Sequence, residues 1–454
     1  MPRTTQIFCA STLYGVATLA AALDSGGFPA ADRRVLLVCN NTTTPETTPS
    51  VDEMPGFAPL RSRFDAVLSW NEAISPFHPG AWAPRPDDVP LLERYLRLLW
   101  GLGEDRVEIV LESIQVNPAQ AIAQVFPGAP VDVYADGLMS YGPTRNKLDP
   151  LIGTRVRRLL HLDLVPGLVP LLLTEFGVPA RTVPTSGFLK VLDEIGEAVA
   201  DLPALPDGAA LLLGQYLSAL DILTVEEEED LHVRMMRGAV ARGHRAVVFK
   251  PHPTAPARYS RVLEAEAGKL GVDLTVLDTP VLAEVLFAGA RPALVVGCFS
   301  TALFTASTFY GLPVARIGTE RLMDRLAPYQ NSNRVPAVLA DALLPDLEDG
   351  EGETRIPEES LADLVRTVGY VMQAQIHPGL RPEAERYLRT LLGPRTKRYF
   401  KRRRLTALGL PGGIPERLSF LPHNSTARRV VRRARALRKA VRRTKAAGRP
   451  LRRG

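Results

Sequence analysis

Residues 293–311, ALVVGCFSTALFTASTFYG, join an apolar run to a second run of helical length through a short polar break. The first run is typical of a buried parallel strand. Ser300 and Thr301, at the break, are residue types that begin helices. A strand that leads into a helix is the repeating unit of open α/β sheets, which bind ligands at the carboxyl ends of their strands. The stretch therefore predicts both the fold class and the edge where a site would form.

Units of this kind recur in two parts of the chain, separated by a proline-containing linker at 202–208. The predicted strands are 6–10, 34–40, 64–70, 106–113 and 131–137, then 210–215, 245–253, 272–278, 293–300 and 312–318. We therefore predict an α/β protein of two doubly wound, Rossmann-like domains that face a cleft. The first would occupy residues 1–201 and the second residues 209–393. Helices within 359–393 would either close the second domain or cross back to the first.

Composition places the chain among globular proteins. It has 454 residues, of which 46% are apolar and 23% charged, and this length favours two domains. Cys9, Cys39 and Cys298 match no metal-ligand spacing, which favours a reducing compartment over a disulfide framework. The N-terminal segment resembles a weak signal peptide, but a strand followed by a helix explains it better. No run of eighteen apolar residues occurs, so a membrane span is not supported.

The charge is unevenly distributed along the chain. Residues 395–454 hold 21 lysines and arginines against one acid, whereas the rest of the chain has a net charge of −14. Apolar residues recur at helical spacing within the tail, so residues 394–454 are expected to form a basic, helical extension. Such a helix suits an anionic membrane surface. We predict a cytoplasmic protein held peripherally at the inner face of the plasma membrane, with nucleic-acid binding as the rival role for the tail and retention of an acidic polysaccharide product as a third.

The first candidate site residue is Asp136, which ends the predicted strand 131–137. A carboxylate at a strand end, followed by Gly137, could take a proton from a substrate hydroxyl. The plainer alternative is that Asp136 caps the helix that follows.

The second candidate site is the segment Lys250-Pro251-His252-Pro253. The two prolines exclude helix and hold the imidazole of His252 on a rigid turn. There the imidazole could donate to a phosphate and Lys250 could add positive charge. A histidine packed under a loop is the structural alternative.

Three further features lie at strand ends or helix starts of the second part. Ser300 and Thr301 offer hydroxyls and free helix amides to an anion, unless they are plain caps. Gly214 and Gln215 end a strand where a ligand could approach the backbone, and Glu284 could accept hydrogen bonds from ribose hydroxyls. The acidic run 226–230 is most simply a solvated first turn of a helix.

Several known site patterns are absent from the sequence. We find no phosphate-binding G-x-x-x-x-G-K-[ST] loop, no G-x-G-x-x-G fingerprint, no G-x-S-x-G elbow and no H-E-x-x-H pair. No aspartate pair follows a strand, so no metal or other cofactor is expected. Phosphate charge would then be carried by Lys250, His252 and the helix amides.

With these motifs in hand, the chain resembles the capsule-type bacterial α-2,8-polysialyltransferases. That family has the glycosyltransferase B architecture and three signatures, an acidic-acidic-glycine turn, a His-Pro pair and a Ser-Ser/Thr pair. The matching residues here are 135–137, 252–253 and 300–301, in the family's order, and the resemblance spans roughly residues 5–330. One departure is that Ala135 stands at the first acidic position.

The resemblance implies transfer of sialic acid from CMP-sialic acid to a glycan hydroxyl, with inversion and without a metal. Asp136 would be the general base, with Glu112 the nearest substitute if the first acidic position were the one required. His252 would stabilise the departing CMP phosphate, helped by Ser300 and Thr301.

Two alternatives remain open from the sequence. A polyol-phosphate transferase of the CDP-glycerol type, as in teichoic-acid synthesis, would share the segment 250–253 and the serine-containing helix start. A non-enzymatic nucleic-acid-binding protein would act through its tail. The acceptor, the linkage, and the choice between single addition and polymerisation are left undecided.

Overall fold

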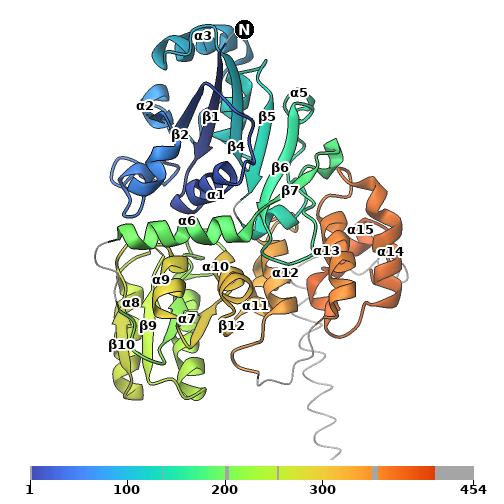
Figure 1. The fold of residues 1–454 in the computed structure, drawn as a ribbon. Coiled ribbons are helices and arrows are strands. Elements are labelled where there is room, and N and C mark those ends of the chain that lie inside the picture. The colour runs from blue at the N-terminus through green and yellow to red at the C-terminus, as the bar shows by residue number, and fades with distance from the viewer. Residues whose placement is uncertain (1–2, 136, 200–203, 253–254, 350–355, 415–454) are drawn as a thin grey trace, which may run out of the picture. The chain divides into compact units, whose positions relative to one another are not determined.

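The computed structural model describes residues 3–135, 137–199, 204–252, 255–349 and 356–414 (Figure 1). Its first sheet has seven parallel strands in the order β3-β2-β1-β4-β5-β6-β7. The strands are β1 (Thr4–Ala10), β2 (Arg33–Val38), β3 (Ala66–Ser69), β4 (Arg106–Glu112), β5 (Val131–Ala135), β6 (Val156–Leu162) and β7 (Ala180–Val183).

The second sheet has five parallel strands in the order β10-β9-β8-β11-β12. They are β8 (Ala210–Leu213), β9 (Ala246–Lys250), β10 (Asp273–Val276), β11 (Leu294–Gly297) and β12 (Val314–Arg316). In both sheets the first strand along the chain has the second on one side and the fourth on the other. The strand order therefore reverses between β1 and β4 and again between β8 and β11, and ligands bind at such switch points.

Helices connect the strands of each sheet. The α-helices up to the second sheet are α1 (Leu13–Asp24), α2 (Trp70–Ile74), α3 (Val89–Leu99), α4 (Ala119–Val125), α5 (Pro150–Gly153) and α6 (Thr185–Ala198). Those that follow are α7 (Val225–Ala241), α8 (Arg258–Leu270), α9 (Ala283–Ala290), α10 (Thr301–Phe304), α11 (Thr319–Arg325), α12 (Arg334–Leu343), α13 (Glu358–Met372) and α14 (Arg381–Thr390). Figure 1 shows α6 running between the two sheets.

Shorter helical turns complete the described chain. The 3-10 helices are η1 (Val51–Glu53), η2 (Ala58–Arg63), η3 (Pro86–Asp88), η4 (Leu138–Tyr141), η5 (Thr174–Phe176), η7 (Pro378–Leu380) and η8 (Thr396–Tyr399), and η6 (Thr305–Phe309) is a π-helix. The last described helix, α15 (Arg402–Ala407), belongs to a separate unit that begins at Arg402. None of the described helices is both long enough and apolar enough to cross a membrane.

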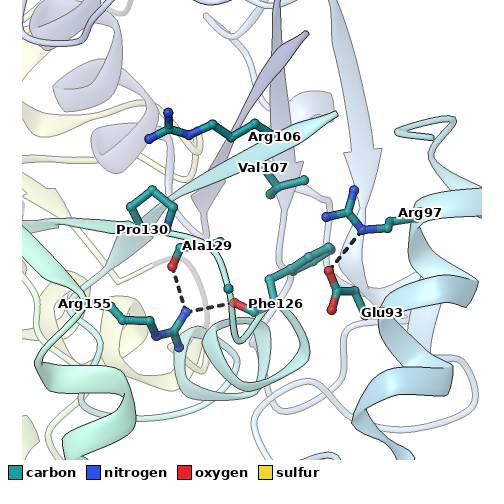
Figure 2. A pocket seen from close by; sticks show the side chains of 9 residues that line it. Glu93, Arg97, Arg106, Val107, Phe126, Ala129, Pro130 and Arg155 are labelled. Atoms are coloured by element: carbon teal, nitrogen blue, oxygen red, sulfur yellow. Dashed lines mark hydrogen bonds and ion pairs between the residues drawn. The ribbon is translucent and has the colours of Figure 1, made fainter. Parts of the chain in front are cut away.

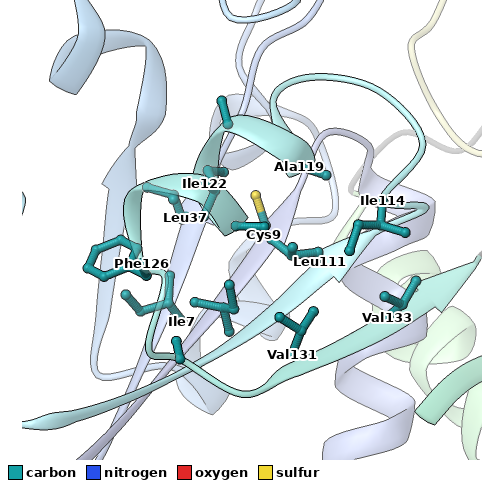
Figure 3. Packing of buried hydrophobic residues seen from close by; sticks show 14 of the residues in the cluster. Ile7, Cys9, Leu37, Leu111, Ile114, Ala119, Ile122, Phe126, Val131 and Val133 are labelled. Carbon is teal, nitrogen blue, oxygen red and sulfur yellow. The ribbon is translucent and has the colours of Figure 1, made fainter. Parts of the chain in front are cut away.

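The central strands of the first sheet, β1, β4 and β5, are buried on both faces, as expected for parallel strands. On one face Ile7, Leu111 and Val133 pack beneath α4, whose Ile122 is fully buried (Figure 3). Helix α1 covers part of the sheet as well, and it begins where the side chain of Thr12 accepts a hydrogen bond from the Gly15 amide. The apolar runs in the sequence therefore correspond to real buried strands.

Two strands of the first sheet are absent from the sequence-based prediction, and charge explains one omission. Arg157 and Arg158 interrupt the apolar pattern of β6. Both donate to Oδ2 of the fully buried Asp132 on β5, over 2.8 and 2.9 Å. The other strand, β7, has only four residues, of which two are exposed.

The helices within 359–393 contact both α12 and the first sheet's part of the chain. A Cβ atom at Gly369, in α13, would lie 2.6 Å from Cδ1 of Leu171. The segment after α14 packs against α12, because the buried Tyr399 donates its hydroxyl to Asp341 of that helix over 2.9 Å. The first compact unit extends to Lys401.

The cysteines are free thiols, although two that are distant in sequence meet in space. The sulfur atoms of Cys9 and Cys39 lie 3.3 Å apart, at the ends of neighbouring strands β1 and β2. All three cysteines are buried.

Candidate active site

The candidate site in the second sheet forms where the loops after β8, β9 and β11 converge. Oε1 of Gln215 accepts a hydrogen bond from the Phe299 amide over 3.0 Å, across the switch point between β8 and β11. The Gly214 amide donates to the Lys250 carbonyl over 2.9 Å. A Cβ atom at Gly214 would lie 3.2 Å from Cα of Pro251, so the close approach of these loops favours glycine here. The structure therefore brings together the features that the sequence placed at three strand ends.

A buried carboxylate fixes the loop after β8. Glu228 of α7 accepts hydrogen bonds from the amides of Leu217 and Ser218 over 2.7 and 2.9 Å, and from the hydroxyl of Tyr259 over 2.9 Å. Its side chain is fully buried, so the prediction that the whole run 226–230 is solvated is wrong at this position. Glu228 shares the inner face of α7 with Leu231 and Met235, and this spacing of three to four residues was the signal available in the sequence.

The fixed loop places an aromatic ring beside the candidate histidine. The ring centroids of Tyr216 and His252 lie 6.4 Å apart, with 46° between the ring planes. The imidazole is exposed, yet the protein around it reduces its hydration, and this is the largest cause of a lowered pKa. Glu228 opposes the lowering of this pKa and Lys250 adds to it. A neutral imidazole can still donate one N–H to an anion.

Lys250 and Glu284 lie deeper than the histidine. Lys250 is 8% exposed, and its ammonium donates to the Thr279 carbonyl over 3.4 Å. Burial lowers the pKa of Lys250, and Glu284 opposes the change. Burial also raises the pKa of Glu284 to about 7, against the effects of its own backbone amide and of Lys250. The two groups therefore form an electrostatically linked pair beneath the loop after β9.

Ser300 and Thr301 stand where α10 begins, as predicted. Oγ of Ser300 accepts a hydrogen bond from the Ala302 amide over 3.3 Å, so Ser300 is the helix cap. The capping role leaves its hydroxyl hydrogen for another acceptor. Helix α10 has only four residues but continues directly into the π-helix η6.

The start of α10 also contacts the loop after β5. A Cβ atom at Gly137 would lie 3.0 Å from Oγ1 of Thr301. Gly137 is the residue after Asp136, which itself lies outside the described residues, as does Pro253. The contact brings the first and third motifs together even though more than 160 residues separate them in the sequence.

Further contacts join η6 to the first sheet's part of the chain. The hydroxyl of Tyr14, in α1, lies 3.2 Å from Oγ1 of Thr305. Thr308 donates its hydroxyl to the Leu164 carbonyl over 3.0 Å. The carboxyl-side loops of both sheets are therefore linked through the segment 301–309.

The switch point of the first sheet holds a second carboxylate. Oε2 of Glu112, at the end of β4, accepts hydrogen bonds from the amide and the hydroxyl of Ser11, over 2.8 and 2.7 Å. Ser113 and Ile114 follow with φ angles of 52° and 32°, a backbone conformation that costs energy for residues other than glycine. Strain of this kind is often found at functional sites. The sequence indicated Glu112 only as a substitute base and gave no sign of its contact with Ser11.

Two cavities lie outside this site. One, of about 460 Å³, opens near the start of β4 and is lined by Arg97, Arg106 and Arg155 (Figure 2). Arg155 donates there to the carbonyls of Phe126 and Ala129, so its role is structural. The other, of about 920 Å³, is mainly apolar and lies beside η6. Within the described ranges, no group of three histidine, cysteine or acidic side chains could hold a metal ion.

Comparisons with known proteins give distant structural similarities. A sialyltransferase from Photobacterium damselae, residues 113–497 corresponding to its GT-B domain, has a TM-score of 0.38 and 13% identity over 74% of this chain and 96% of that one. MurG from Acinetobacter baumannii has a TM-score of 0.39 and 11% identity over 84% and 93% of the two chains. UDP-GlcNAc 2-epimerase from Methanocaldococcus jannaschii has a TM-score of 0.44 and 12% identity over 78% and 95%.

The sequence comparison with protein families is decisive. No curated protein matches the chain. The two parallel, Rossmann-like sheets have the predicted α/β glycosyltransferase B architecture. The family model for alpha-2,8-polysialyltransferase matches residues 6–319, and the chain belongs to this family. The protein is a sialyltransferase.

Proposed function

We propose that the protein transfers sialic acid from CMP-sialic acid to a hydroxyl of a glycan acceptor, with inversion at the anomeric carbon and without a metal ion. The observation that carries the proposal is the contact between Gly137 and Thr301. It puts Gly137, the residue that follows Asp136 in the sequence, next to the start of α10. A base for the acceptor and an anion site for the leaving group would then flank one reacting centre.

The residues of the second sheet would hold the donor. His252 would donate an N–H to the CMP phosphate, and the hydroxyls of Ser300 and Thr301 would add hydrogen bonds. Lys250 would supply positive charge at the end of β9. The residue is largely buried, and electrostatic interactions are stronger there than in water because the effective dielectric constant is lower. CMP is a good leaving group, so stabilising its developing charge and orienting the acceptor would account for most of the catalysis.

Three other residues would complete the donor site. Gly214 would let the nucleotide approach the backbone, and Gln215 would hold the loops after β8 and β11 together. Glu284 would accept hydrogen bonds from the ribose. A carboxyl group with a pKa of about 7 can accept or donate at neutral pH, so this role is compatible with its burial.

Asp136 is the proposed general base. It follows β5 directly and precedes the glycine that contacts Thr301. Glu112 is the second candidate, because it also stands at a strand end of the first sheet. One of its oxygens already accepts two hydrogen bonds from Ser11, which makes it a poorer proton acceptor and a better positioning group.

The test is a comparison of donors. Purified protein would be incubated separately with CMP-sialic acid and CDP-glycerol in the presence of a chelator, and CMP release would be measured. We expect CMP to be released from CMP-sialic acid but not from CDP-glycerol, and this release to persist when the chelator is present. Mass spectra should then show an acceptor lengthened by sialyl residues. Release from CDP-glycerol only would favour the polyol-phosphate reaction and overturn the proposal. Loss of transfer in Asp136→Ala but not in Glu112→Ala would support the assigned base.

Membrane association through residues 395–454 remains part of the proposal. Residues 415–454 lie outside the described part of the chain, and the proposal rests on the concentration of basic residues there.

A further inference from the structure

Helix α3 exposes a concentration of large apolar side chains. Eleven such side chains are exposed in the described residues, and four of them belong to this one helix. They are Leu91, Tyr95, Leu98 and Leu99, with exposed fractions of 69%, 46%, 73% and 51%. We call these four side chains the α3 face. Single apolar residues are common on protein surfaces, but a contiguous set marks a surface that binds a partner or a membrane.

The spacing of residues along α3 explains why this face stays uncovered. At 3.6 residues per turn, the apolar residues of α3 occupy about half of the helix circumference. One side of this arc packs inward, because Leu96 is buried and α3 contacts α4. Leu91, Tyr95 and Leu98 follow one another at intervals of four and three residues, so they form a stripe on the other side of the arc. The apolar arc of α3 is therefore wider than the part that packs on the protein.

An arginine-lined cavity lies beside the same helix. The cavity of about 460 Å³ is lined by Glu93 and Arg97 of α3 and by Arg106 and Arg155 (Figure 2). Three arginines against one glutamate give the lining a net charge of +2. Glu93 forms its ion pair with Arg97 over 3.0 Å, so it does not balance the other two arginines. The cavity is therefore suited to an anion.

Arg106 is the cation of this cavity that a ligand reaches most easily. Its side chain is 63% exposed, and its nitrogen lies 3.6 Å from the carboxylate of Glu108. Glu108 also pairs with Arg157 over 3.3 Å and accepts a hydrogen bond from Gln6, so it keeps partners when Arg106 turns away. Arg94 is exposed as well, and helical geometry puts it between the cavity and the α3 face.

An apolar stripe flanked by arginines matches the surface of an anionic membrane. Helices that lie in the membrane interface carry leucines on one side and arginines or lysines on the other. The planar fork of arginine binds phosphate with parallel hydrogen bonds, and lipid headgroups present phosphates. A second copy of the chain fits less well, because a symmetric contact would bring the same arginines opposite one another. Charge therefore favours lipid over self-association.

The position of α3 determines which side of the molecule such a membrane would meet. Figure 1 shows α3 beside the end of the first sheet where the chain starts, away from α6 and the second sheet. The arginine cavity lies near the start of β4, and the seven residues of this strand extend over about 23 Å. Docking through α3 would leave the carboxyl ends of the strands, and with them the candidate active site, directed away from the lipid.

We propose that the α3 face and the arginine cavity beside it form a membrane-docking surface for an anionic lipid bilayer. The leucines enter the boundary between headgroups and acyl chains, and the arginines bind lipid phosphates. The inference rests on the proposed function in taking an anionic membrane as the partner. It adds a contact that is separate from residues 395–454 and partly apolar, whereas the contact of the tail is mainly electrostatic.

The test measures sedimentation of the full-length protein with vesicles of phosphatidylcholine and phosphatidylglycerol. Salt is varied from about 0.1 M to about 1 M, which shortens the Debye length from about 10 Å to about 3 Å. Wild-type binding should weaken but persist at high salt, because apolar contact is not screened. Leu91→Gln/Leu98→Gln should lower the partition coefficient at least tenfold at both salt concentrations. Arg106→Gln should lower it about fivefold at low salt only.

Matched variants control for the chemical change itself. Leu220→Gln/Leu391→Gln makes the same change at two other exposed leucines and should bind vesicles as wild type does. The urea midpoints of both double variants should equal that of wild type, because all four side chains are exposed. As a second readout, the fluorescence of Leu98→Trp should shift to the blue with vesicles, whereas that of Leu391→Trp should not.

The outcomes separate this inference from the proposed function. Binding that disappears at high salt and ignores the leucine changes would leave the tail as the membrane contact and overturn the role of the α3 face. Absence of binding at either salt concentration would contradict membrane association as a whole, and CMP release without vesicles tests sialyl transfer independently. A dimer in vesicle-free solution that the leucine changes dissociate would assign the α3 face to a second copy and overturn the proposal too.

Discussion

Replacing Glu228 by glutamine tests how the donor site is built. The carboxylate accepts hydrogen bonds from two backbone amides and from Tyr259, and it is fully buried. A glutamine keeps one oxygen but turns an NH₂ group towards at least one N–H donor. That donor then has no partner, which costs about 1–3 kcal/mol for a buried polar group. The loss of charge weakens the remaining hydrogen bonds, so we expect a total loss of about 2–5 kcal/mol.

Such a loss should leave the protein folded but loosen one loop. Typical unfolding free energies are about 5–15 kcal/mol, so most molecules would remain native. Glu228 fixes the segment 217–218, which directly follows Tyr216, and the ring of Tyr216 lies beside His252. We therefore expect the KM for CMP-sialic acid to rise at least tenfold in Glu228→Gln, with a smaller effect on the acceptor KM.

The matched control is Glu229→Gln, the same chemical change one residue further along α7. Glu229 forms a surface ion pair with Arg258 at 2.7 Å, and such pairs contribute about 0–1 kcal/mol. Urea unfolding would compare the stabilities, and CMP-release kinetics would give the donor KM. If Glu228→Gln unfolds at the same urea concentration as Glu229→Gln and keeps the wild-type donor KM, the role assigned to Glu228 is refuted.

Three other changes probe the remaining parts of the site. Gly137→Ala should lower kcat at least tenfold because its Cβ would press on Oγ1 of Thr301; adding Thr301→Ala should restore part of the loss, and Gly128→Ala, in open space, should have no effect. The pKa of free His252 is lowered, so phosphate binding should raise it; donor affinity should therefore increase as the pH falls from the raised pKa of the bound form towards the lowered pKa of the free form, and a pH titration of His252→Gln should lack this component. Truncation after Lys401, which spares the buried Tyr399, should reduce binding to anionic vesicles at least tenfold without changing CMP release.

The sequence revealed the strand ends and their motifs because both depend on local patterns. Apolar runs of four to eight residues marked β8, β9 and β11, and the polar residues after them are the ones that converge at the switch point. The resemblance to the polysialyltransferases rested on those same short motifs, and the family match confirms it.

What the sequence could not reveal depends on contacts between distant residues. The sequence did not reveal β6 because Arg157 and Arg158 interrupt its apolar pattern. Their partner, Asp132, lies about 25 residues earlier, so no local pattern shows that the two charges are balanced. The backbone of Arg145 is hydrogen-bonded to the side chains of Gln115 and Gln373, and no local pattern links these positions. Secondary structure follows from nearby residues, but the partner of a buried polar group is chosen by the fold.

The two switch points use the same kind of link with different chemistry, and the difference suits the proposed reaction. A side-chain oxygen of one loop accepts a hydrogen bond from a backbone amide of the neighbouring loop. In the first sheet the oxygen belongs to the carboxylate Glu112, and in the second to the neutral amide Gln215. The negative charge of Glu112 would be tolerated on the acceptor side, where a hydroxyl gives up its proton. A negative charge in place of Gln215 would repel the donor phosphate by about 4 kcal/mol, for two unit charges 4 Å apart at an effective dielectric constant of 20.

The variant Gln215→Glu tests this reasoning, because a carboxylate can still accept the Phe299 amide. The loops should therefore stay linked, and the urea midpoint should stay close to the wild-type value. Repulsion of the phosphate should nevertheless weaken donor binding by more than tenfold, and added salt should recover part of the affinity by screening. Calorimetric titration with CMP would measure both effects. Unchanged affinity at low salt would show that the donor phosphate does not lie beside Gln215.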